Sequence, residues 1–212
     1  MSRTLLVFGD SNSHGSPPIV NPGEYLRFDK AIRWPQIMAR ALDENWTIIE
    51  EGLPGRTTQF DDPVMGGHMN GQTGLRIALE SHGPIDLLVI MLGTNDAKTR
   101  FNPTPERIVA GIAGLIDIGL SEPMQTRHDG FEILAICPPP VEEVGPIAGE
   151  FLGGGAVSAG VAPVLAAHCA ARGTAFFDAG TVIEVSPQDG IHFEPEAHQA
   201  LGAAVARVVT GM

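Results

Sequence analysis

The sequence of 212 residues has few cysteines, few basic residues and no long unbroken apolar run. Its two cysteines, Cys137 and Cys169, form no metal-binding motif and no disulfide framework. Only 13 lysines and arginines stand against 25 aspartates and glutamates, which gives a formal net charge of −12. This charge argues against nucleic acid or an anionic membrane as a partner. Without an apolar run of 18 residues, we expect no transmembrane helix.

Motifs of several other protein classes are missing as well. No P-loop or G-x-G-x-x-G sequence follows an expected strand, and no spacing of histidine and acidic residues suggests a metal. We therefore expect no metal and no cofactor. The G-x-S-x-G motif is also absent, and Ser158, its nearest counterpart, follows three glycines where a strand would be required. The N-terminus lacks the pattern of a signal peptide, so we expect a cytoplasmic protein.

What the sequence does contain is a regular alternation of strand-like and helix-like segments. Short apolar runs predict strands at residues 4–8, 46–50, 85–92, 131–136 and 174–177. Apolar residues at helical spacing predict helices at residues 31–43, 71–82, 104–120, 157–172 and 195–209. This pattern predicts a single α/β domain over residues 1–212, a three-layer α/β/α sandwich. Right-handed crossovers favour a five-stranded parallel sheet in the flavodoxin-like order 2-1-3-4-5.

Polar residues and glycines follow the ends of three expected strands. Ser11 comes after the first strand, Gly55 after the second and Asn95 after the third, while Asp189 and His192 belong to a loop near the C-terminus. In a parallel sheet the carboxyl ends of the strands share one edge, and ligands bind there. We therefore expect these residues to meet.

Together these residue types match the requirements of ester cleavage by a serine nucleophile. The reaction needs a hydroxyl, a base within hydrogen-bonding reach and a group that orients the base, and Ser11, His192 and Asp189 supply one of each. It also needs donors for the developing oxyanion. The backbone N–H groups of Ser11 and Gly55 and the side-chain amide of Asn95 are the candidates. Gly55 would let the backbone approach the substrate closely.

The arrangement of these motifs resembles the SGNH (GDSL-type) hydrolase family. The resemblance rests on four blocks in the family's order: Gly9-Asp10-Ser11, Gly55, Gly93-Thr94-Asn95-Asp96 and Asp189-Gly190-Ile191-His192. Residues 50–58 and 177–180 are similar to the aryl esterase/acyltransferase branch, which includes a mycobacterial enzyme. The resemblance implies an esterase acting on short-chain acyl or aryl esters, and acyl transfer to alcohols in addition. It assigns Ser11, His192 and Asp189 as the catalytic triad, and Ser11, Gly55 and Asn95 as the oxyanion hole.

Two other functions remain open at this point. A carbohydrate acetyl esterase would share the mechanism, and a non-catalytic binding domain could use the same fold. For the substrate pocket we expect contributions from Asn12, His14, Trp34 and Phe101. Asp10 is expected to hold its loop as a hydrogen-bond acceptor, as is Asp96.

The partners we expect are a small ester substrate and further copies of the same chain. Two long loops, residues 16–30 and 145–160, carry apolar residues that a monomer would expose: Ile19, Tyr25, Leu26, Ile147, Phe151 and Leu152. Members of the resembling branch form closed homo-oligomers, octamers among them. We therefore expect a homo-oligomer larger than a dimer, with an octamer as one possibility.

Overall fold

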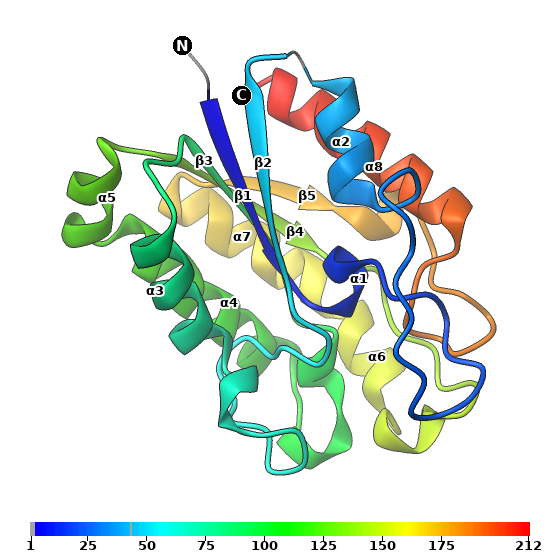
Figure 1. Ribbon diagram of the computed structural model, residues 1–212. Helices are drawn as coiled ribbons and strands as arrows, with labels where there is room; N and C mark the ends of the chain where they lie inside the picture. The colour runs from blue at the N-terminus through cyan, green and yellow to red at the C-terminus, as the bar shows by residue number, and fades with distance from the viewer. Residues whose placement is uncertain (1–2, 43) are drawn as a thin grey trace.

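A parallel β-sheet of five strands forms the centre of the computed structural model, which describes residues 3–42 and 44–212 (Figure 1). The strands are β1 (Arg3–Gly9), β2 (Trp46–Gly52), β3 (Leu87–Met91), β4 (Glu132–Cys137) and β5 (Ala175–Asp178). Their order in the sheet is β2-β1-β3-β4-β5, and all neighbouring pairs are parallel. The predicted fold and strand order are therefore confirmed.

Helices cover both faces of the sheet. Helices α2 (Trp34–Ala41) and α8 (Pro195–Thr210) pack together on one face (Figure 1). The other face carries α3 (Gly71–Ser81), α4 (Pro105–Leu120) and α7 (Val161–Arg172). The remaining helices are α1 (Ser11–His14), α5 (Glu122–His128) and α6 (Gly154–Ala159), with short 3₁₀ turns η1 (Gly67–Met69), η2 (Asn95–Ala97), η3 (Thr99–Phe101), η4 (Ala148–Glu150) and η5 (Ala179–Thr181).

Successive residues of each strand enter opposite halves of the core, as the two-residue period of a strand requires. On β1, Leu5 and Val7 pack with α2 and α8, while Leu6 and Phe8 pack with α3 and α4. All four side chains are fully buried. A sheet covered on both faces requires such continuous apolar runs, which is why the strands could be recognised in the sequence.

The segment Gly154–Arg172 is long and apolar enough, by composition alone, to span a membrane. Ser158 and His168 interrupt this segment, so it is not the unbroken apolar run that the sequence was found to lack. In the structure the segment is divided at Gly160 into α6 and α7, and α7 packs against α4, β4 and β5. Here its apolar residues therefore form part of the helical layer over the sheet. The sequence did not predict this division or the short helix α5.

The strand ends bring the candidate site residues to one edge of the sheet. In the pairing register Gly9 lies beside Gly52 of β2 and beside Met91 of β3. These three residues are the last of their strands, so the loops that follow start at the same level. Ser11, Gly55 and Asn95 lie two to four residues beyond these ends, on the edge where α/β sheets bind ligands.

Candidate active site

Ser11 is the first residue of the single-turn helix α1, directly after β1. Asp10 caps this helix: its carboxylate accepts a hydrogen bond of 2.9 Å from the backbone N–H of Asn12. Short polar residues favour such a turn because they replace the missing backbone partners of a helix start. As the first residue of the helix, Ser11 has a backbone N–H without an intrahelical acceptor. The hydroxyl group of Ser11 and this N–H are therefore both available at the edge of the sheet where the cavity lies.

A continuous chain of hydrogen bonds links Ser11, His192 and Asp189. The distance from Nε2 of His192 to Oγ of Ser11 is 3.0 Å, and that from Nδ1 to Oδ2 of Asp189 is 2.6 Å. Ser11 is 6% exposed and His192 is 5% exposed, and Asp189 is fully buried. With the Nδ1 proton held by the carboxylate, Nε2 can accept the hydroxyl proton.

The loop that carries Asp189 and His192 is organised around the carboxylate. Oδ1 of Asp189 accepts hydrogen bonds of 3.0 Å from the backbone N–H groups of Ile191 and His192, and Oδ2 accepts one of 2.7 Å from Ile19. Burial alone would raise the pKa of Asp189, but these donors and the His192 side chain hold that pKa below its ordinary value. Gly190 permits the turn because its φ is +71°.

Candidate donors for an oxyanion come from two further loops. Gly55 has a φ of +89°, a conformation that favours glycine, and the terminal methyl group of Met65 packs close to its Cα. Asn95 is 6% exposed, and its Nδ2 donates a hydrogen bond of 3.2 Å to the carbonyl of Arg56. That bond uses one amide hydrogen and leaves the second available. Ser11, Gly55 and Asn95 all line one cavity.

Two buried carboxyl groups lie behind this edge. Burial raises the pKa of Asp10 and of Asp96 to about 6 in each case. Asp96 accepts hydrogen bonds from the backbone N–H of Thr58 at 2.9 Å and from its hydroxyl at 2.5 Å. Neither carboxyl lines the cavity. Both hold loops in place, and neither has access to a bound ester.

The cavity at this edge has a volume of about 320 Å³. Of the four residues expected in the substrate pocket, His14 lines it and the other three do not. Asn12 is 1% exposed and donates a hydrogen bond of 3.1 Å to the carbonyl of Ile191. Trp34 is fully buried between the sheet and α8, and Phe101 stacks on Phe60 with ring centroids 4.8 Å apart. The prediction for these three residues is corrected because each makes its contacts within the fold.

Most of the cavity wall comes from residues that were not expected in the substrate pocket, although Ile19 and Leu26 belong to a loop singled out for its apolar side chains. One side is formed by the loop after α1 and includes Pro17, Ile19 and Leu26. The other side includes Met65 and Lys98. Ser158, the alternative serine, lies outside this cavity, and its hydroxyl donates to carbonyls of its own helix. The only hint of Lys98 in the sequence is its position three residues after Asn95, and the sequence does not reveal that its side chain is buried.

Comparison with known families agrees with this geometry. Residues 7–200 match the model of the GDSL-like lipase/acylhydrolase family. The chain belongs to the GDSL-like lipase/acylhydrolase family. It is therefore a carboxylic ester hydrolase, and the hydrolase prediction is confirmed. Among curated proteins no sequence matches the chain.

Solved structures of several esterases are similar over nearly the whole chain. Est24, a carbohydrate acetylesterase from Sinorhizobium meliloti, is 37% identical, with a TM-score of 0.92. The aryl esterase of M. smegmatis is 34% identical, with a TM-score of 0.91. A putative arylesterase from Agrobacterium tumefaciens is 36% identical, with a TM-score of 0.87. Each comparison covers 99% of both chains.

Proposed function

We propose that this GDSL hydrolase cleaves short-chain acyl and aryl esters through an acyl-enzyme on Ser11. The observation that carries the proposal is the unbroken hydrogen-bond chain from Oγ of Ser11 through His192 to Asp189. The cavity above it holds a small ester, since its volume of about 320 Å³ lies at the lower end of ordinary ligand pockets. Apolar groups such as Ile19 and Leu26 suit an acyl chain or an aromatic ring.

The proposed reaction proceeds in two acyl-transfer steps. Oγ of Ser11 attacks the ester carbonyl carbon while Nε2 of His192 takes the hydroxyl proton. The carbonyl oxygen becomes an oxyanion, which the N–H groups of Ser11 and Gly55 and the amide of Asn95 stabilise. The tetrahedral intermediate then expels the alcohol, which receives the proton from His192. Water then attacks the acyl-enzyme in the same way, with His192 taking its proton, and the reaction releases the acid and regenerates Ser11.

The rate of p-nitrophenyl acetate hydrolysis is expected to rise as the pH increases from about 5 to 8. The base must be neutral to accept a proton, and a histidine that is protonated at low pH cannot act as one. Asp189 does not contribute to this change because its lowered pKa keeps it ionised throughout the range. The measurement is kcat/KM across the range, with circular dichroism confirming the fold at each pH. A profile that is flat from pH 5 to 8, with acylation limiting, would contradict a histidine base.

We also propose that the protein transfers acyl groups to alcohols within a homo-oligomer larger than a dimer. Two apolar side chains at the cavity are exposed, since Tyr25 is 93% exposed and Leu26 is 60% exposed. Exposed apolar groups mark association sites, and this supports the proposal. On the opposite loop Leu152 is 61% exposed, whereas Phe151 is buried in the core and does not contribute to such a surface. Covering these groups with a neighbouring subunit would narrow the entrance and exclude water. An alcohol would then compete better for the acyl-enzyme.

With a vinyl ester and benzyl alcohol in water, benzyl ester is expected among the early products. Product analysis by chromatography measures the ratio of benzyl ester to free acid, and light scattering measures the mass of the assembly at micromolar concentration. Free acid as the sole early product would contradict transfer. A mass equal to one chain of 22.4 kDa would contradict the oligomer. Either result leaves the hydrolase itself unaffected.

A carbohydrate acetyl ester is the second candidate substrate. Polar residues at the cavity mouth, Asn21, Glu24 and Arg27, would suit the hydroxyl groups of a sugar. The similarity to the acetylesterase Est24 supports the same idea. A panel that includes an acetylated sugar and an aryl acetate separates the two candidates by kcat/KM.

A further inference from the structure

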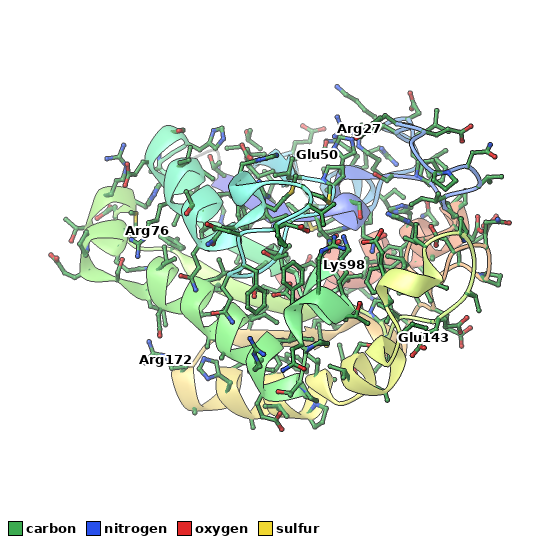
Figure 2. The ribbon with its side chains drawn as sticks, turned by 90° about the horizontal axis from the view of Figure 1, so that it is seen from below. Arg27, Glu50, Arg76, Lys98, Glu143 and Arg172 are labelled. Atoms are coloured by element: carbon green, nitrogen blue, oxygen red, sulfur yellow. The ribbon has the colours of Figure 1, made fainter. Side chains whose placement is uncertain are left out.

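Lys98 is a buried cation in the wall of the proposed active site. Its side chain is 8% exposed, and the residue lines the same cavity as Ser11 and Asn95. Figure 2 shows Lys98 where the segments that follow β3 and β4 approach each other. Burial of a lysine is costly unless its ammonium group finds partners. The contacts of this group therefore indicate what the cavity is built to hold.

The partners of Lys98 leave much of its hydrogen-bonding capacity unused. Its Nζ lies 3.9 Å from Sδ of Met65, which is a weak acceptor. The nearest carboxylate oxygen, Oε2 of Glu150, is 3.7 Å away, beyond hydrogen-bonding distance. That same oxygen accepts a bond of 2.7 Å from Nη1 of Arg100. An ammonium group has three donors, so a bound molecule can satisfy at least one of them here.

The charges around Lys98 favour a neutral partner. Arg100 pairs with Asp62 at 3.0 Å as well as with Glu150. The cluster therefore contains two cations, Lys98 and Arg100, and two anions, Asp62 and Glu150. A substrate carboxylate would add an unbalanced negative charge beside Glu150. A hydroxyl group would add none, and it could accept a hydrogen bond from Lys98 while donating one to Glu150.

The position of Lys98 indicates which half of an ester it faces. The leaving oxygen must lie beside His192, and the loop that contains Ile19 covers that side by bonding Asp189. Lys98 is on the oxyanion side, since it contacts Met65, whose terminal methyl group lies against Gly55. With the leaving group directed toward His192 and the oxyanion toward Gly55 and Asn95, we place the acyl group along the remaining wall of the cavity, which contains Lys98.

From these contacts we infer that Lys98 and Glu150 form a subsite for a hydroxyl group on the acyl chain, so that hydroxyacyl esters are preferred substrates. The inference rests on the proposed function, because it concerns the acyl side of the same site. Replacing the hydroxyl by a methyl group of similar size would leave the ammonium without that partner. A site built to bind a hydroxyl discriminates strongly against an analogue that lacks it.

The test compares p-nitrophenyl 3-hydroxybutanoate with p-nitrophenyl 3-methylbutanoate, which differ by a hydroxyl in place of a methyl group. For the wild-type protein, kcat/KM should be about tenfold or more higher for the hydroxy ester, in the range of hydrogen bonds to charged groups. In Lys98→Met, which places an unbranched apolar chain one atom shorter than that of lysine and without charge, the ratio should fall to about one or below. Lys98→Gln, which replaces the ammonium group with the neutral NH₂ donor of an amide, should give an intermediate ratio.

The matched control is Lys30→Met, because Lys30 is the other lysine of the sequence and is exposed. Its ratio should equal that of the wild type. A wild-type ratio of one or less overturns the inference, and so does a ratio unchanged in Lys98→Met. A third ester, mono-p-nitrophenyl glutarate corrected for spontaneous hydrolysis, overturns the neutral-hydroxyl assignment if it is preferred over the hydroxy ester. If the wild type cleaves none of these esters, the proposed function fails, and the inference that rests on it fails with it.

Discussion

Replacing Ser11 with alanine is expected to lower kcat for p-nitrophenyl acetate by about 10⁵-fold or more. In the proposed mechanism this hydroxyl forms the acyl-enzyme, and its Oγ lies 3.0 Å from Nε2 of His192. The residual rate would come from the oxyanion donors and from binding alone. The fold should be retained, because the substitution removes only the hydroxyl oxygen of Ser11, which forms a hydrogen bond with the side chain of His192.

Ser158→Ala is the matched control for this experiment. Ser158 is the serine that most resembles a nucleophile motif in the sequence, yet its hydroxyl is bonded to carbonyls of α6 and lies outside the cavity. Its variant should retain activity within about threefold of the wild type, as expected of a residue outside the reacting groups. A folded Ser11→Ala protein with more than a tenth of the wild-type rate would rule out Ser11 as the nucleophile.

Asn95→Ala is expected to lower kcat by about 10²- to 10³-fold with little change in KM. The amide would act on charge that develops in the transition state, so its loss affects turnover more than substrate binding. Its geometry is set before substrate binds, because Nδ2 already donates to the carbonyl of Arg56 and the side chain is buried. Steady-state kinetics with p-nitrophenyl acetate separate the two parameters.

A suitable control is Asn102→Gly, seven residues further along the same segment. Asn102 has a φ of +47°, a conformation that glycine adopts easily, and it does not line the cavity. If Asn102→Gly matched the defect of Asn95→Ala, disturbance of the segment rather than loss of the amide would explain both. An increase in KM alone for Asn95→Ala would make Asn95 a binding residue and would contradict its role as an oxyanion donor.

Local patterns in the sequence were sufficient for the strands and their order. In runs such as residues 85–92, every residue that faces a helical layer is apolar. This apolar pattern is local in the sequence and does not depend on distant contacts. The expected meeting of Ser11, Gly55 and Asn95 followed from topology, because each lies just beyond a parallel strand end. Their catalytic roles stay predictions until the variants are measured.

The sequence by itself therefore determined the α/β fold, the family resemblance and the residues gathered at the edge of the sheet. Only the tertiary structure decided which side chains form the cavity wall. Trp34 and Phe101 are apolar enough for a pocket, but α8 covers the first and Phe60 stacks on the second. From the sequence alone Lys98 would be expected to be an ordinary surface lysine, but the tertiary structure places Glu150, 52 residues away, beside it. Burial depends on which distant segments cover a residue, and no local pattern contains that information.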